Sequence, residues 1–230
     1  MNGVTLTLVD LNHHMVNAWA HVFDGIHGVE VVHGSLLDEQ VDAWVTPTNS
    51  RAQMNGGVDA AVLGRLGRPI QARVRRAVVS HFGDFMPVGV ATCVETGRAT
   101  PRYLISAPTM SGVADNVSAT LNVALACGAA LQAVREQNRR LPGSIKSVAV
   151  PGMGAGTGQV PVAVCADLMW TAWNLFNAHD FDSFADMRVA LEAELGDLGP
   201  APVVAPTTPY RTRGPVLPVP FHGERRPVSA

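Results

Sequence analysis

Short apolar runs alternate with longer segments of helical apolar spacing along most of this chain. Residues 5–9 alternate apolar and polar positions, as a half-buried strand does, and residues 13–23 carry apolar side chains three and four positions apart, as an amphipathic helix does. The same two patterns predict strands at 5–9, 29–32, 43–45, 90–95, 103–107 and 147–150, and helices at 13–23, 58–66, 69–82, from 116 or 118 to 139, 161–176 and 181–195. Such alternation is typical of an α/β fold with a mostly parallel sheet covered by helices on both faces.

The C-terminal part of the chain differs in composition from the rest. A length of 230 residues suits one domain with an appendage. We predict a domain over residues 1–178, a C-terminal helix within 179–196 that ends at Gly196, and a proline-rich tail over 197–230. That tail holds eight of the sixteen prolines, which is typical of an extended segment.

Charge and composition narrow the choice of partner. The chain has 47% hydrophobic and 16% charged residues, which favours a globular protein with a sizeable core. Its 17 basic and 19 acidic residues leave a net charge of −2, so the chain as a whole lacks the basic field that attracts nucleic acid, and we expect no specific nucleic-acid partner. Lys146 is the one lysine, which excludes chemistry that needs a second.

The cysteines indicate a reducing compartment, and the apolar segments indicate neither secretion nor membrane insertion. Cys93, Cys127 and Cys165 are scattered and show neither a CxxC pair nor metal-ligand spacing, so we expect reduced, buried thiols and neither a metal nor a cofactor. The first ten residues lack the pattern of a secretory signal, and the longest apolar segment, 117–134, is interrupted by polar side chains. These features predict a cytoplasmic protein without a membrane partner.

The first candidate for chemistry follows the predicted strand at 43–45. Asn49 offers a carboxamide that both donates and accepts, as a ribose diol requires, and Gly56 and Gly57 allow a ligand close to the backbone where a helix begins. The free N–H groups of a helix N-terminus favour phosphate. Asp59 lies in the first turn of that helix, where a carboxylate suits either the helix dipole or a functional role.

The second candidate is a glycine-rich loop behind the strand at 147–150. It spans residues 151–161, Pro-Gly-Met-Gly-Ala-Gly-Thr-Gly-Gln-Val-Pro, and a helix follows it. The loop is not a Walker A loop because it has no lysine, and it does not fit GxGxxG because Thr157 occupies the third glycine position. A strand, a run of backbone donors and a helix are suited to hold a diphosphate, although a structural turn would show the same glycines.

These two loops, in this order, resemble those of macrodomains. The family pattern is a strand with Gly-Asp-Ile, a strand with Val-Asn-Ala-Ala-Asn, then Gly-Gly-Gly-Val-Asp, and later a Ser-Thr-Gly loop. The counterparts here are Val32-His-Gly34-Ser35-Leu36, Val45-Thr-Pro-Thr-Asn49-Ser50, Asn55-Gly56-Gly57-Val58-Asp59 and Gly154-Ala155-Gly156-Thr157-Gly158. Asp10-Leu-Asn12 and the PGxGxGTGxVP loop are similar to a branch of uncharacterised bacterial and phage macrodomain proteins.

The resemblance covers about residues 4–177 and implies a three-layer α/β/α domain with a mixed, mostly parallel sheet that binds ADP-ribose. It implies that Asn49 contacts the distal ribose and that Asp59 activates water, as in family members that hydrolyse ADP-ribosyl linkages. The remaining ligand-binding positions that it implies are Ser35, Leu36, Thr48, Gly56, Gly57, Val58, Pro108, Gly154, Ala155, Gly156, Thr157 and Gly158. Ser35 takes the position at which the family usually has an aspartate that fixes the adenine.

Three functions are therefore open from the sequence. The first is an enzyme that binds ADP-ribose or a related nucleotide diphosphate and hydrolyses an ADP-ribosyl linkage of a modified substrate. The second is a module that only recognises this ligand. The third is a phage-associated structural protein with a vestigial pocket.

Overall fold

The computed structural model describes residues 3–196, which form a six-stranded sheet between two helical layers. The strands are β1 (Thr5–Asp10), β2 (Val29–His33), β3 (Ala43–Asn49), β4 (Thr92–Glu95), β5 (Tyr103–Met110) and β6 (Ser147–Val150). Their order is β2-β1-β6-β3-β5-β4, and every neighbouring pair is parallel except β4 with β5. The expected α/β/α architecture with a mixed, mostly parallel sheet is confirmed.

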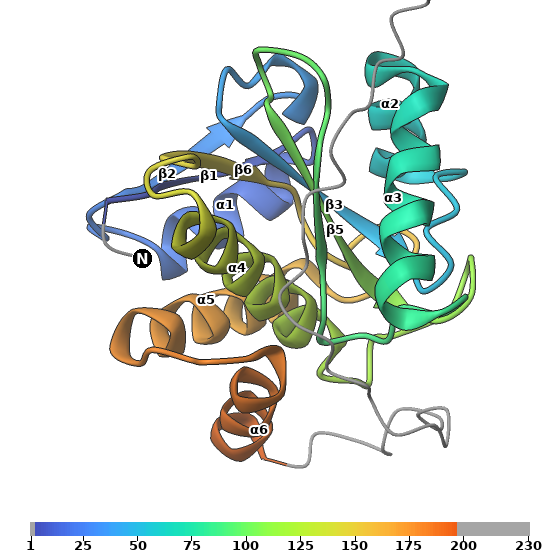
Figure 1. Ribbon diagram of the computed structural model, residues 1–230. Helices are drawn as coiled ribbons and strands as arrows, with labels where there is room; N and C mark the ends of the chain where they lie inside the picture. The colour runs from blue at the N-terminus through green and yellow to red at the C-terminus, as the bar shows by residue number, and fades with distance from the viewer. Residues whose placement is uncertain (1–2, 197–230) are drawn as a thin grey trace, which may run out of the picture.

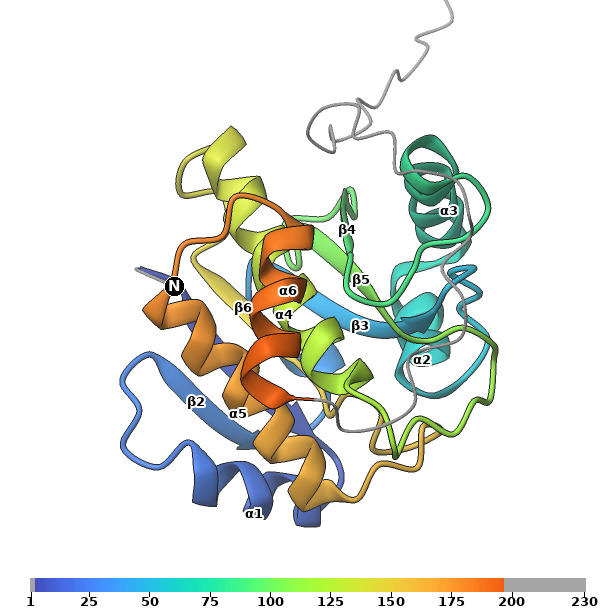
Figure 2. The same ribbon diagram turned by 90° about the horizontal axis from the view of Figure 1, so that it is seen from below.

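Helices cover both faces of the sheet. They are α1 (His13–Val22), α2 (Gly57–Leu66), α3 (Arg68–Phe82), α4 (Asn122–Arg140), α5 (Val162–Ala178) and α6 (Phe184–Leu195), with a 3₁₀ turn, η1 (Leu36–Asp38). Figure 1 shows α2 and α3 along one face and α1, α4 and α5 along the other. Figure 2, seen from below, shows α6 lying outside α4 on that second face.

Alternation along the strands explains why the sheet has two buried faces. Trp44 and Leu104 pack with the α2–α3 layer, whereas their neighbours Val45 and Ile105 pack with the α1–α4–α5 layer. Successive side chains of a strand point to opposite faces, so each strand supplies both cores. Sheets covered in this way carry their functional groups at the strand ends, where loops replace the packed layers.

Several boundaries differ from the sequence predictions. β3 continues four residues beyond the predicted end and contains Pro47, and β5 continues through Pro108 to Met110. β3 pairs with β6 only over Ala43 and Trp44, so beyond Trp44 it has one neighbour, β5, and a proline is tolerated more easily there.

Two helix starts were also predicted wrongly. α4 begins at Asn122, because Asn116 Oδ1 accepts the N–H of Ser118 in a turn before the helix. α6 begins at Phe184, where the Ser183 side chain accepts the N–H of Asp186. Gly196 ends α6 with a φ of 67°, as predicted, and the proposed tail lies outside the described residues.

The C-terminal helix α6 shares a core with the rest of the domain. Met187 and Leu191 are buried with side chains of α4 and α5. Gly128 of α4 makes this close packing possible, since a Cβ at that position would lie 2.6 Å from Met187 Sδ and 2.8 Å from Leu191 Cδ1. α6 is therefore packed as part of the domain.

We expect Gly128→Leu to displace α6 and to lower the free energy of unfolding by about 1–3 kcal/mol, because an added side chain overpacks this contact. Gly64→Leu in α2 is the matched control, since a Cβ there meets nothing within 4 Å. The control should be neutral or more stable by up to about 1 kcal/mol. Urea denaturation of both variants is the measurement, and equal stability of the two would contradict the packing described.

No helix among residues 3–196 is both long and apolar enough to cross a membrane.

Candidate functional site at the carboxyl edge of the sheet

The candidate residues gather where the parallel strands end. β1 ends at Asp10, β3 at Asn49, β5 at Met110 and β6 at Val150. These strands are mutually parallel, so their ends lie along one edge of the sheet. The loops that follow carry most of the positions singled out in the sequence, and α2 begins after one of them.

Asn49 holds the loop that follows β3. Its Oδ1 accepts the N–H groups of Arg51 and Gln53 at 3.1 and 3.2 Å, and its Nδ2 donates to the Gln53 carbonyl at 3.0 Å. The side chain is 6% exposed. These three hydrogen bonds fix the conformation of the loop that leads to α2. The second N–H of Nδ2 meets no acceptor within residues 3–196 and can donate to a ligand.

Asp59 is a buried carboxyl between α2 and β3. It is 4% exposed, and Thr46 Oγ1 donates to its Oδ1 at 2.5 Å. Burial raises the pKa of Asp59 to about 6, while the hydroxyls of Thr46 and Thr48 act in the opposite direction. Thr48 Oγ1 meets no partner at hydrogen-bond geometry, so Thr46 is the donor that holds this carboxyl. A carboxyl with this pKa changes its protonation near neutral pH.

The first turn of α2 presents free backbone donors. Gly56 is the N-cap residue and gives no side-chain hydrogen bond, and Asp59, although in that turn, accepts no capping N–H. The N–H groups of Gly57 and Val58 meet no acceptor among residues 3–196. A φ of 52° at Gly57 lies in the region that favours glycine. This helix N-terminus is therefore open to an anion.

The glycine loop after β6 has a long run of free backbone donors. Within residues 3–196, no protein acceptor takes the N–H groups of residues 153–158. The loop is held by its carbonyls instead: Gly154 O accepts from Val160 N, Gly156 O from Gln159 N, and Gly158 O from Val117 N. Six consecutive backbone donors without protein partners are suited to phosphate oxygens.

Close packing accounts for two of the loop glycines. A Cβ at Gly158 would lie 2.7 Å from both Gly154 O and Val117 Cγ2. A Cβ at Gly152 would lie 2.8 Å from Asp10 Oδ2, which accepts the Gly152 N–H at 3.0 Å. Asp10 Oδ1 also accepts the Asn12 N–H, so this carboxylate ties the glycine loop to the end of β1.

The other sequence candidates lie on the edge in different surroundings. Ser35 follows β2, and its Oγ accepts the Leu37 N–H at the start of η1. Leu36 is buried in the core beneath α2. Thr48 and Pro108 are paired across β3 and β5 just before a register shift. Ala155 is half-buried, and Gly156 and Thr157 are exposed in the glycine loop.

Two residues of the site were not recognised from the sequence. Thr46 holds Asp59, and Val117 packs against the glycine loop. Thr46 shares a strand face with Thr48 by period-2 alternation, which was an available signal. No sequence pattern pointed to Val117, because it contacts Gly158, which is 41 residues away in the sequence.

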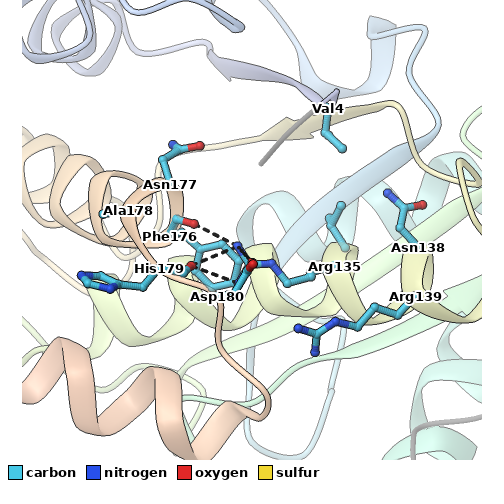
Figure 3. A pocket seen from close by; sticks show the side chains of 10 residues that line it. Val4, Arg135, Asn138, Arg139, Phe176, Asn177, Ala178, His179 and Asp180 are labelled. Atoms are coloured by element: carbon cyan, nitrogen blue, oxygen red, sulfur yellow. Dashed lines mark hydrogen bonds and ion pairs between the residues drawn. The ribbon is translucent and has the colours of Figure 1, made fainter.

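A separate cavity of about 410 Å³ lies at the opposite edge of the sheet, beside Val4 before β1 and the ends of α4 and α5. Figure 3 shows Arg135 reaching over the Phe176 ring towards the end of α5. Its guanidinium donates to the carbonyls of Phe176 and His179 and pairs with Asp180 at 3.4 Å. Arg135 therefore supplies hydrogen-bond donors to carbonyl groups at the C-terminal end of α5. None of the site residues predicted from the sequence lines this cavity.

Within residues 3–196 no group of three or more His, Cys, Asp or Glu side chains is placed to hold a metal ion. The thiols of Cys93, Cys127 and Cys165 are buried, and burial raises the pKa of each to about 12.

The sequence profile of the Macro domain family matches residues 45–169, and this chain belongs to the macro domain family. An uncharacterized protein of Aquifex aeolicus is 37% identical over 141 residues, which cover 61% of this chain and 78% of that protein. A macro domain-containing protein of Streptomyces griseus is 30% identical over 132 residues, which cover 56% and 68%.

Solved structures have the same fold. A mutant Oceanobacillus iheyensis macrodomain with ADPR superposes with a TM-score of 0.52 at 14% identity, covering 84% of this chain and 95% of that one. The macrodomain of Mycobacterium tuberculosis DarG gives 0.50 at 22% identity, covering 62% and 88%.

Proposed function

We propose that this protein binds ADP-ribose at the carboxyl edge of its sheet. The observation that carries the proposal is the run of free N–H donors at residues 153–158, together with the open N-terminus of α2. A diphosphate would accept these donors and would meet the positive end of the α2 dipole. Membership of the macro domain family supports the choice of ligand, and so do Oceanobacillus iheyensis macrodomains solved with ADPR and with ADP.

Isothermal titration calorimetry tests this binding. ADP-ribose should bind with a dissociation constant on the order of micromolar and more tightly than NAD, ADP or a guanine analogue. ADP carries the diphosphate without the distal ribose, so its weaker binding would assign part of the affinity to the sugar. Binding of none of the four ligands would overturn the proposal and favour a structural protein with a vestigial pocket.

Hydrolysis of an ADP-ribosyl linkage is a second candidate function, and the environment of Asp59 favours it. A carboxyl with a pKa of about 6 is mostly ionised at neutral pH and is basic enough to take a proton from water. In this reaction water attacks the anomeric carbon of the distal ribose and gives a proton to Asp59. The bond from that carbon to the modified group breaks, and the leaving group acquires a proton.

Replacement of Asp59 separates an enzyme from a binding module. Asp59→Asn should abolish release of ADP-ribose from mono-ADP-ribosylated protein and change the affinity for ADP-ribose less than about threefold, because the amide cannot take the proton but keeps the shape. Asp186→Asn, in the first turn of α6, is the matched control and should release ADP-ribose at the wild-type rate. Absence of release by stoichiometric wild-type protein would instead assign the protein to the binding modules.

A further inference from the structure

The positive charge of this protein is concentrated in one segment. Residues 60–102 contain seven arginines and two acidic residues, whereas the rest of the chain contains ten basic and seventeen acidic residues. The net charge of −2 therefore combines a segment of +5 with a remainder of −7. Figure 1 shows that the first half of this segment lies in the helical layer α2–α3, and the rest includes β4.

Five exposed arginines make up what we call the arginine face: Arg65, Arg68, Arg75, Arg76 and Arg98. Among residues 3–196 none of the five forms an ion pair, whereas Arg102, Arg135, Arg139, Arg140 and Arg188 each pair with a carboxylate. Of the two acidic residues in the segment, Glu95 already pairs with Arg102. Within the described part of the chain, the arginine face therefore carries positive charge that no ion pair compensates.

Backbone contacts hold parts of the face together. Arg98 donates to the Arg65 carbonyl at 3.1 Å, which brings the β4–β5 turn against the end of α2. Arg68 and Arg75 are seven residues apart in α3 and lie on the same side of the helix, about 10 Å apart along its axis. Arg76 extends that side.

We propose that the arginine face binds the phosphate backbone of duplex nucleic acid without reading its sequence. Guanidinium groups match phosphate oxygens in a bidentate geometry. Each phosphate that an arginine neutralises releases counterions, and this release drives non-specific binding.

The residue types on the arginine face favour duplex nucleic acid over a protein, a lipid surface or a single strand. Within residues 3–196, Val79 is the one large apolar side chain exposed on α2 or α3, so the face lacks the apolar centre of a protein interface. The apolar side of α3 is buried against the sheet, which leaves no apolar side for a lipid surface. No aromatic side chain is exposed on α2 or α3 in the described residues, so single strands would find no stacking platform.

Fluorescence anisotropy with a labelled random-sequence 24-bp DNA duplex tests this binding. For the wild type, the plot of log affinity against log salt between 50 and 200 mM should have a slope of about −4, which corresponds to four or five phosphate contacts. Arg75→Gln with Arg76→Gln should make the slope less negative by about 2 and weaken binding roughly tenfold at the lower salt. Both side chains are exposed, so the thermal melt should be unchanged.

A double variant of equal charge change is the matched control. Lys146→Gln with Arg188→Gln removes two positive charges outside the arginine face and should keep the wild-type slope. An equal loss in this control, no binding of the duplex at 50 mM salt, or displacement of the duplex by polyglutamate at equal charge would overturn the proposal.

The duplex and ADP-ribose should bind independently, because the arginine face includes none of the residues at the carboxyl edge. The Arg75→Gln, Arg76→Gln variant should bind ADP-ribose as the wild type does in calorimetry, and saturating ADP-ribose should leave the duplex bound. Displacement of the duplex by ADP-ribose would overturn the assignment to this face. Failure of ADP-ribose binding alone would affect only the function proposed above.

Discussion

Between pH 3.5 and pH 7.5 the free energy of unfolding of Asp59→Asn should rise by about 3 kcal/mol relative to that of the wild type. The pKa of Asp59 rises from 3.8 in the unfolded chain to about 6 in the folded protein, because the carboxyl is buried. Well below pH 3.8 the carboxyl is protonated in both states, so its ionisation does not contribute to the pH dependence. Between pH 3.8 and 6 the folded state holds more protons than the unfolded state, so wild-type stability falls as pH rises through this window. The two pKa values differ by about two units, which is about 3 kcal/mol.

Urea denaturation of the wild type and of Asp59→Asn from pH 3.5 to 7.5 measures the difference between their free energies of unfolding. The other titrating groups are the same in both proteins, so their contributions to this difference cancel. Thr46→Val provides a second check on the cause: it removes the hydroxyl that donates to Asp59 Oδ1, so the pKa of Asp59 should rise further and the pH window should extend upward. A difference between wild type and Asp59→Asn that does not vary with pH would show that the carboxyl is solvated.

Local patterns were sufficient for most of the fold. Short, mostly apolar runs located all six strands, because the sheet is covered on both faces and the side chains on both sides of a strand join a core. The ends of β3 and β5 were predicted too early because prolines usually stop strands. Pro47 and Pro108 lie inside strands because sheet pairing outweighs the local preference there.

The candidate site could be located from the sequence, but its internal contacts could not. The glycine loop and the Asn49–Asp59 segment both follow strands, which was enough to predict that they share an edge of the sheet. That Asp59 is held by Thr46, and that Asp10 accepts the Gly152 N–H, depends on contacts between separate elements. Sequence spacing therefore gives the residues of a site more readily than their hydrogen-bond partners.

The net charge of the whole chain does not describe how charge is distributed along it. The total of −2 led us to expect no specific nucleic-acid partner, and it does not show that five exposed arginines of residues 60–102 form no ion pair within residues 3–196. Net charge counted separately for neighbouring elements, such as α2 with α3, shows an uneven distribution of charge that the net charge of the whole chain hides. The proposed duplex binding follows from this distribution.

Gly158→Ala should open the glycine loop and reduce the affinity for ADP-ribose at least tenfold. The added Cβ would lie 2.7 Å from Gly154 O and 3.0 Å from Gly154 Cα, and backbone atoms cannot move aside without changing the loop. Loss of the Gly158 O contact with Val117 N would free the segment before α4 as well, so we expect unfolding free energy to fall by about 1–3 kcal/mol.

Gly156→Ala is the matched control for this effect, since a Cβ at Gly156 meets nothing within 4 Å. Its unfolding free energy should stay within about 0.5 kcal/mol of the wild type. Calorimetry and urea denaturation of the pair distinguish two roles of the loop glycines. If Gly158→Ala lost affinity and stability while Gly156→Ala kept its stability, packing at Gly158 would be what holds the free N–H groups in position. If both variants kept wild-type stability and affinity, the loop would tolerate side chains, and the donors of residues 153–158 would not depend on this packing.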